Sequence, residues 1–315
     1  MIHWSEKDGW AHFYRYDING NLLNRITSGP FHSDNIKYYD QKSNFLFFSA
    51  HGVNKEIDPY YEHTYKISLN GGVPKLLNKG DFNTMTYPSD NHKFFVNNFS
   101  RVNTTPKSNL INSDGSVIMN LETADLSALF ESGYKFPETF KAKADDGITD
   151  LYGVIYKPFD FDENKKYPLL EYVYPGPQTE SVNKSFSVRM DRLDRMAQLG
   201  FIVITLGNRG GHPDRSKWYH NYGYGNLRDY GLADKKYVAQ QLANRHDFID
   251  INRVGIYGHS GGGFMSTAAI LVYPDFFKVA YSQAGNHDNS IYNSWWSETH
   301  HGILEETDDD GNIKY

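Results

Sequence analysis

The sequence contains no cysteine, no long apolar run and no basic block, and each absence excludes a class of protein. Without cysteine the chain forms no disulfide and no thiolate metal site, which leaves its compartment open. No apolar run reaches the length of about 18 residues that a membrane-spanning helix needs. A net charge of −6 without a Lys/Arg cluster argues against nucleic acid as a partner. Residues 1–6 show no signal-peptide pattern.

The first third of the chain is instead rich in Tyr and Phe and in tight turns. Pairs of strand-like runs flank the turns Ile18-Asn19-Gly20, Asn70-Gly71-Gly72 and Ser113-Asp114-Gly115. Asn-Gly and Asp-Gly between such runs indicate β-hairpins. A recurrence about every 45 to 50 residues predicts propeller blades of four strands each, with a plain antiparallel sandwich as the alternative. Closure needs about four to eight blades, so residues 1–122 are expected to form only the final blades of a β-propeller.

Beyond a connecting segment over 123–137, which contains a short predicted helix at 125–132, the pattern changes. Strands and helices alternate from residue 138 to 315, which predicts a mostly parallel sheet covered on both faces. The expected elements are a hairpin over 139–157, strands over 169–174, 201–206, 254–257 and 278–283, and helices over 188–199 and 230–243.

The segment Gly258-His259-Ser260-Gly261-Gly262-Gly263 lies between one of these strands and a helix-like stretch. Strand, G-x-S-x-G and helix in this order are typical of the nucleophile elbow of an α/β-hydrolase. The turn holds its serine in a strained backbone geometry that exposes the hydroxyl, and the small residues let strand and helix pass closely. Ser260 is therefore the candidate nucleophile. The alternative is a Gly-rich turn with an incidental serine.

Acyl transfer by a serine also needs hydrogen-bond donors for the oxyanion. The backbone N–H of Gly261, directly after the nucleophile, supplies one donor. The segment Val173-Tyr174-Pro175-Gly176-Pro177 offers a second one, because the phenol of Tyr174 stands on a stiff turn. The alternative for Tyr174 is an ordinary tyrosine at the end of a strand.

Three motifs, Tyr174-Pro175-Gly176-Pro177, Asn208-Arg209-Gly210 and Gly258–Gly263, occur in the order found in the prolyl oligopeptidase family of serine peptidases. Over nearly its whole length the chain most resembles the dipeptidyl peptidase IV branch of that family. The resemblance implies a peptidase that cleaves short peptides through an acyl-enzyme on Ser260. It also implies that Tyr174 completes the oxyanion hole, and that Tyr292 and Trp296 form the P1 pocket, which holds proline in this branch.

The chain departs from the branch at the pocket, which leaves the proline preference open. His259 and Gly261 stand where the dipeptidyl peptidases carry Trp and Tyr, and Asn289 replaces a usual Trp. The alternative for Tyr292, Trp295 and Trp296 is an ordinary aromatic core under a loop. The resemblance alone suggests a periplasmic or secreted protein, and a homodimer for the full-length form.

A serine hydrolase of this type carries its acid and its histidine after the serine. None of the candidates after Ser260 is expected to serve: Asp275, His287, Asp288, His300, His301 and Asp308–Asp310. We therefore expect a chain cut at both ends, lacking the first blades, the last two strands and the triad Asp and His. Such a piece is expected to be inactive alone and, with an unpaired sheet edge, prone to aggregation.

Two other functions stay open: a non-catalytic binding protein with a degenerate hydrolase domain, and an esterase on the same fold. No cluster of His, Asp or Glu has the sequence spacing of a metal site, so neither a metal nor a cofactor is expected. Arg209 is expected to tie loops together near the site. Asp229 and Asp234 are expected to stabilise the N-terminus of the helix over 230–243, where a carboxylate interacts favourably with the helix dipole.

Overall fold

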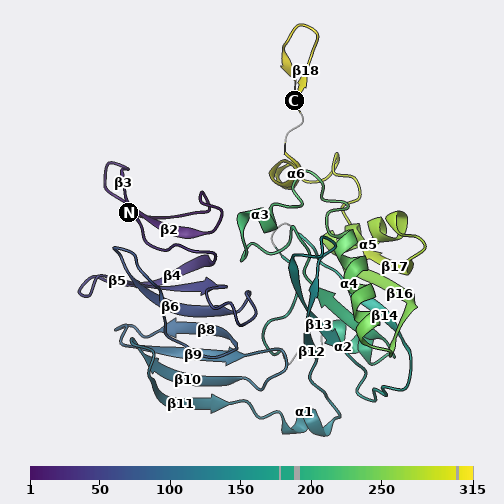
Figure 1. The fold of residues 1–315 in the computed structure, drawn as a ribbon, viewed down its shortest axis with the longest axis horizontal. Helices are drawn as coiled ribbons and strands as arrows, with labels where there is room; N and C mark the ends of the chain where they lie inside the picture. Colours follow the sequence, from purple (N-terminus) through teal and green to yellow (C-terminus); the bar gives the residue numbers. More distant parts are fainter. Residues whose placement is uncertain (177–178, 188–191, 303–304, 315) are drawn as a thin grey trace.

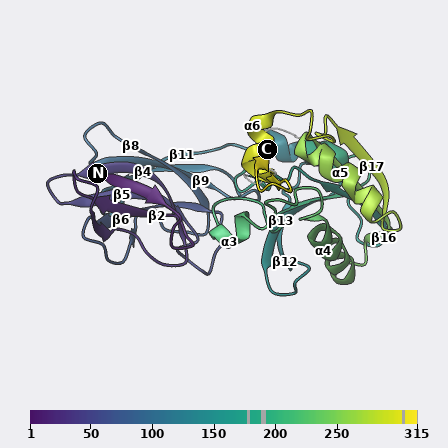
Figure 2. The same cartoon turned by 90° about the horizontal axis from the view of Figure 1, so that it is seen from above.

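The chain folds into two regions that lie side by side, as Figures 1 and 2 show. Residues 1–123, here called the blade region, form stacked antiparallel sheets, and residues 138–302, the mixed-sheet region, form one sheet with helices on both faces. The helix α1 (Ser127–Glu131) lies between them. None of the described helices is long and apolar enough to cross a membrane. The computed structural model describes residues 1–176, 179–187, 192–302 and 305–314.

The blade region completes one sheet before it starts the next, because consecutive strands are hydrogen-bonded neighbours in the orders β1-β2-β3, β4-β5-β6-β7 and β8-β9-β10-β11. The predicted hairpins are the last two strands of each sheet, which confirms the propeller-like prediction. The strands are β1 (Ile2–Ser5), β2 (His12–Tyr16), β3 (Leu22–Arg25), β4 (His32–Asp40), β5 (Phe45–His51), β6 (Glu62–Ser68), β7 (Lys75–Leu76), β8 (Asn83–Pro88), β9 (Phe94–Ser100), β10 (Lys107–Asn112) and β11 (Val117–Thr123).

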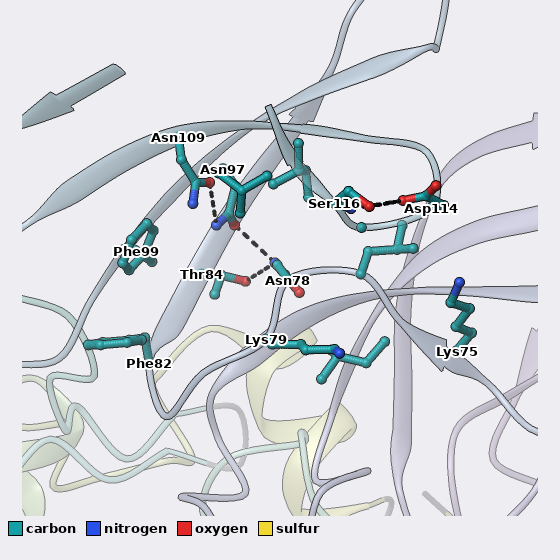
Figure 3. A pocket seen from close by; sticks show the side chains of 15 residues that line it. Lys75, Asn78, Lys79, Phe82, Thr84, Asn97, Phe99, Asn109, Asp114 and Ser116 are labelled. Atoms are coloured by element: carbon teal, nitrogen blue, oxygen red, sulfur yellow. Dashed lines mark hydrogen bonds between the residues drawn. The ribbon is translucent and has the colours of Figure 1, made fainter. Parts of the chain in front are cut away.

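A row of buried amides joins the second and third of these sheets (Figure 3). Asn78 accepts a hydrogen bond from the backbone N–H of Thr64 at 2.9 Å, so its Nδ2 must face the other way. That nitrogen donates to Thr84 Oγ1 at 2.7 Å and to Asn97 Oδ1 at 3.0 Å. Asn97 in turn donates to Asn109 Oδ1 at 3.2 Å. These bonds cross from one sheet to the next beside a cavity of about 490 Å³.

The mixed-sheet region has the strand order β12-β13-β15-β14-β16-β17. It opens with the predicted antiparallel hairpin, and β14 then pairs in parallel with both β15 and β16, as β16 does with β17. Its strands are β12 (Glu138–Lys143), β13 (Asp150–Tyr156), β14 (Tyr167–Tyr172), β15 (Ile202–Leu206), β16 (Ile249–His259) and β17 (Phe277–Gln283).

Alternate residues of these strands face opposite layers, as their period of two requires. Leu170 and Val203 pack under α2, whereas Leu169 and Ile204 share a cluster with residues of α4 and α5. The sheet is thus covered on both faces, as predicted. The helices are α2 (Arg192–Ala197), α3 (Lys217–His220), α4 (Leu232–Arg245), α5 (Gly261–Val272) and α6 (Ser294–His301).

Several expected boundaries differ from the structure. The strand before the elbow begins at Ile249 rather than at 254, and the helix expected from 230 begins at Leu232. Of the helix expected over 188–199, residues 188–191 lie outside the described residues. The Asp308–Asp310 segment is the exposed turn of a small hairpin between β18 (Glu306–Thr307) and β19 (Ile313–Lys314).

Buried polar contacts join the two regions. The Tyr60 hydroxyl, from the blade region, donates to Glu180 Oε1 at 2.8 Å, and Tyr219 donates to the same carboxylate oxygen. Nearby, Lys184 Nζ lies 2.7 Å from Asp58 Oδ2. These contacts lie between side chains far apart in the sequence, so they fix the blade region against the loops that follow β14 and β15.

Candidate active site

Ser260 stands at the junction of β16 and α5 with φ 57° and ψ −119°. A positive φ is rare for a residue with a side chain and costs free energy that the surrounding structure must offset. β16 ends at His259 and α5 begins at Gly261, so the whole turn consists of Ser260. The predicted strand, elbow and helix are therefore present, with the strain that a nucleophile elbow requires.

The glycines of the motif are required by close contact with the chain after β14. A Cβ added at Gly258 or at Gly262 would overlap the carbonyl oxygen of Val173. A Cβ at Gly261 would lie 2.6 Å from the carbonyl oxygen of Pro175. The backbone of residues 173–175 therefore runs directly against the elbow, which brings the segment that carries Tyr174 to the nucleophile.

The backbone of Ser260 is fixed, whereas its hydroxyl has no partner among the described residues. Its N–H donates to the carbonyl of Gln283 at 2.8 Å, and its own carbonyl accepts from Phe264 N at 3.0 Å. All 13 histidines of the chain lie in the described ranges, and none is hydrogen-bonded to Ser260 Oγ. His287 lies instead 3.4 Å from the hydroxyl of Ser282.

Three of the other candidates after the serine also have partners elsewhere. Asp288 accepts from the hydroxyl of Ser290 at 2.6 Å, and Asp308 accepts from the backbone of Asn312 at 2.9 Å. His300 is buried, and its ring lies 4.9 Å from that of Trp296. Within the described part of the chain, Ser260 therefore lacks a base.

The two expected oxyanion donors, Gly261 and Tyr174, lie on the two segments that meet in the close contact between the elbow and residues 173–175. Gly261 is the first residue of α5, and the N–H groups of a first helical turn have no acceptor within their helix. Tyr174 is half-buried, and its Cα lies 3.3 Å from where a Cβ at Gly262 would stand. Pro177, the last residue of the predicted stiff turn, lies outside the described residues.

The aromatic segment after β17 reaches the elbow through Trp296. Trp296 and Gly261 line the same small cavity, of about 20 Å³. The ring of Tyr292 meets that of Trp296 edge to face, with 5.8 Å between centroids. Tyr292 is 46% exposed and Trp295 is 70% exposed, so these residues do not form the aromatic core that was the alternative.

Of the other residues of this cavity, only Pro175 and Gly176 were singled out from the sequence, as part of the turn that carries Tyr174. The other lining residues come from the β14 loop, the approach to α4, the elbow helix and the segment after β17: Pro175, Gly176, Leu227, Tyr230, Phe264 and Asn286. The spacing of Tyr292, Trp296 and His300 by four residues is a helical signal that could have revealed α6.

Buried charges brace the loops around this site. Arg209 donates to both carboxylate oxygens of Asp234, with 2.8 Å from NH2 to Oδ1, and also contacts Asp146, so it ties loops as expected. Asp234 is fully buried in the first turn of α4. Beneath the loops, burial raises the pKa of Glu171, and burial lowers the pKa of Lys235, which donates to the carbonyl of Leu206.

A strained serine between a parallel strand and a helix, beside propeller-like sheets, defines an α/β-hydrolase joined to a β-propeller. The sequence profile of the prolyl oligopeptidase family matches residues 186–315, and that of the dipeptidyl peptidase IV (DPP IV) N-terminal region matches residues 1–106. The chain belongs to the prolyl oligopeptidase family, in its dipeptidyl peptidase IV branch.

Individual relatives agree with this assignment. The chain is 40% identical to human dipeptidyl peptidase 8 over 152 residues, which are 48% of this chain and 17% of that protein. It is 24% identical to dipeptidyl peptidase 4 of Trichophyton equinum over 96% of this chain and 39% of the relative. The crystal structure of Porphyromonas gingivalis dipeptidyl peptidase 4 superposes with a TM-score of 0.81 at 26% identity, covering 96% of this chain and 42% of that one. The chain thus spans less than half the length of these relatives.

Proposed function

We propose that this chain carries the nucleophile of a serine peptidase that cleaves short peptides. The observation that supports this most is the backbone of Ser260, held at φ 57° between β16 and α5 by contacts that only glycines allow. Such strain needs a compensating role, and exposing a nucleophilic hydroxyl is the role that this geometry serves in α/β-hydrolases.

In the proposed reaction, Ser260 Oγ attacks the scissile carbonyl carbon, its proton passes to a base, and the carbonyl oxygen becomes an oxyanion. The N–H of Gly261 and the phenol of Tyr174 donate hydrogen bonds to that oxyanion. Collapse of the intermediate, with transfer of that proton from the base to the departing nitrogen, expels the amine and leaves an ester on Ser260, which water then hydrolyses.

Trp296 and Tyr292 are the proposed walls for the P1 side chain. The supporting observation is that Trp296 lies beside the elbow, since it and Gly261, one residue from the nucleophile, line the same small void of about 20 Å³. Flat aromatic walls suit a proline ring, which offers apolar area and no hydrogen-bond donor. Proline at P1 is thus the substrate to test first.

The 315-residue chain alone is expected to show no turnover, because its histidines give Ser260 no base. The purified chain should hydrolyse neither Gly-Pro p-nitroanilide nor p-nitrophenyl acetate above the rate of its Ser260→Ala variant. Hydrolysis that depends on Ser260 would show that a histidine within the chain reaches the nucleophile, and would overturn this expectation.

Sequencing the gene on both sides of this reading frame would show whether flanking codons add an Asp and a His. The protein expressed with those codons should cleave the anilide, and Ser260→Ala should abolish turnover. Cleavage of the ester alone would favour an esterase. A stop directly after residue 315 would favour a binding protein, because Ser260 would keep no base.

In that active form, Tyr174→Phe should lower kcat by about 10²–10³, the usual loss on removing one oxyanion donor. KM should change little, because the oxyanion exists only in the transition state. An unchanged kcat would remove Tyr174 from the mechanism.

The matched pair Trp296→Ala and Trp295→Ala tests the P1 wall. Trp296→Ala should lower kcat/KM for Gly-Pro p-nitroanilide by roughly 10–200-fold, the range for altered apolar contacts in a substrate pocket. Trp295→Ala, at a neighbouring side chain that is 70% exposed, should leave kcat/KM within about twofold. Equal losses in both variants would contradict the pocket assignment.

A further inference from the structure

Two carboxylates and an imidazole from adjacent strands of the blade region converge on one point. Asp34 lies on β4, His51 on β5 and Glu62 on β6, and His51 is directly opposite Glu62 in the strand register. One oxygen of each carboxylate and one ring nitrogen of His51 all lie within 4.8 Å of one another. The pattern is invisible along the sequence because each strand supplies a single residue.

The imidazole is held in the orientation that a metal ligand needs. His51 is 7% exposed, and its Nδ1 lies 3.1 Å from the backbone carbonyl of Tyr60. A carbonyl only accepts hydrogen bonds, so Nδ1 carries a proton and Nε2 is the ring nitrogen left to bind a metal ion. No described group is hydrogen-bonded to Nε2 in this buried side chain. Metal-binding histidines are commonly oriented in this way, through the other ring N–H.

The carboxylates are positioned but only partly neutralised. Asp34 Oδ2 accepts from the hydroxyl of Ser49 at 3.2 Å and from the amide of Asn35 at 2.5 Å. Glu62 Oε1 is buried without a hydrogen bond of good geometry, and it forms an ion pair with Lys37 Nζ at 3.0 Å. One ammonium therefore faces two carboxylates.

We infer that Asp34, His51 and Glu62 bind a divalent transition-metal ion of the Zn²⁺ type, in place of the ammonium of Lys37. One imidazole nitrogen and two carboxylate oxygens are suitable zinc ligands, and three protein ligands leave the fourth position to water. The buried imidazole disfavours Mg²⁺ and Ca²⁺, which prefer oxygen alone.

The position of the site gives the ion a structural role. It would clamp β4, β5 and β6 at the ends that face the mixed-sheet region. His51 Nδ1 also lies 3.6 Å from Asp214 Oδ2 of that region, and Tyr60, which orients His51, donates to Glu180 there. An ion on His51 is therefore expected to stabilise the contact between the two regions as well as the sheet itself.

Calorimetric titration of the metal-free protein with Zn²⁺ tests the inference. We expect one ion per chain and a rise in Tm on binding. His51→Ala should weaken binding by about 100-fold or more, since even changes outside the ligand set cost about 10–100-fold. Lys37→Met should strengthen binding, because it removes the competing cation. Zn²⁺ binding that is unchanged in His51→Ala would overturn the proposal.

Control variants separate ligation from folding. Asp34→Asn and Glu62→Gln keep the side-chain shape, so each should weaken Zn²⁺ binding while leaving the metal-free Tm within a few degrees. His3→Ala, at an exposed histidine, should bind Zn²⁺ as the parent does. Equal weakening in His3→Ala, parent-like binding in both carboxylate variants, or a parent with no zinc affinity would each contradict the site.

Discussion

The blade region and the mixed-sheet region both bury polar side chains, but the two sets differ in kind. The mixed-sheet region buries carboxyl and amino groups, those of Glu171, Glu180, Asp234 and Lys235, besides neutral groups such as Thr205 and Asn208. The blade region buries hydroxyls, amides and imidazoles: His12, Thr27, His32, Ser33, Ser49, His51, His63, Thr64, Asn78, Thr84, Thr86, Asn97 and Ser100. A buried charge is tolerated only with a strong partner, whereas a neutral group needs only directional hydrogen bonds.

This difference follows from the kind of structure that the buried groups stabilise in each region: irregular loops in the mixed-sheet region and stacked sheets in the blade region. Two of these buried carboxylates lie beyond the carboxyl ends of β14 and β15, where Arg209 meets Asp234 and where Glu180 meets two tyrosines. Ligands bind at that edge of an open α/β sheet, so its irregular loops have to be braced. The blade region stacks regular sheets, and neutral groups such as Asn78 link one sheet to the next.

The largest expected effect tests the tight packing of the mixed-sheet region. Gly262→Ala should lower the free energy of unfolding by more than about 4 kcal/mol, or leave the chain unfolded, because its methyl would overlap the carbonyl oxygen of Val173. Urea unfolding followed by far-UV circular dichroism measures the change.

Leu271→Ala is the control on the same helix. Leu271 is 74% exposed, so its truncation should change stability by no more than about 0.5 kcal/mol. If Gly262→Ala were as mild as this control, the contact between the elbow and residues 173–175 would be loose. The argument that only glycine fits there would then fail.

The same close packing explains which parts of the site the sequence could predict. The elbow could be predicted because adjacent residues specify it. Glycines lie on both sides of Ser260, between a strand and a helix, and few other structures are compatible with that pattern. The backbone N–H of Gly261 as a donor follows from the same motif, whereas the expectation that Tyr174 lies near the elbow rested on the family resemblance. The hairpins at Asn70-Gly71 and Asp114-Gly115 were equally predictable, because each turn is specified by adjacent residues.

Contacts between distant segments could not be predicted. Nothing near Tyr60 or Glu180 in the sequence indicates that they meet, and the three proposed metal ligands come from three strands. The helix α6 (Ser294–His301) was not predicted, because Trp296 suggested a pocket wall and His300 and His301 suggested catalytic candidates, rather than a helical spacing. Long-range pairing depends on how whole sheets stack, which no local pattern encodes.

A smaller effect is expected from breaking the neutral network of the blade region. Asn78→Ala removes the acceptor of Thr64 N–H and the donor to Asn97, and both groups are buried. Leaving a buried group unsatisfied costs about 1–3 kcal/mol, so the variant should lose about 2 kcal/mol of stability in urea unfolding.

Asn19→Ala provides the comparison, because Asn19 is exposed in a turn of the same region. Its stability should stay within about 0.5 kcal/mol of the parent. A loss in Asn78→Ala no larger than this would show that the amide row does not hold the sheets together.

The smallest expected effect is on the pH dependence of stability, which should differ between a buried imidazole of the blade region and a buried carboxyl of the mixed-sheet region. Burial lowers the pKa of His12 from 6.5 to about 4, and its ring bonds Thr27 and the carbonyl of Gly29. The unfolded chain takes up a proton below pH 6.5 and the folded chain does not, so this histidine contributes stability above pH 6.5 that is lost as pH falls towards 4. Burial of the Glu171 carboxyl acts in the opposite sense, since its raised pKa reduces stability as pH rises.

His12→Gln should remove this acid sensitivity, because an amide can donate to Gly29 without titrating. Between pH 7.5 and pH 5 the parent should lose up to about 2 kcal/mol more than the variant in urea unfolding followed by tryptophan fluorescence. His3→Ala, at an exposed imidazole, should keep the slope of the parent. If His12→Gln kept that slope as well, neutral burial of this imidazole would not explain acid sensitivity. Burying neutral imidazoles in the blade region would then have no measurable effect on how its stability depends on pH.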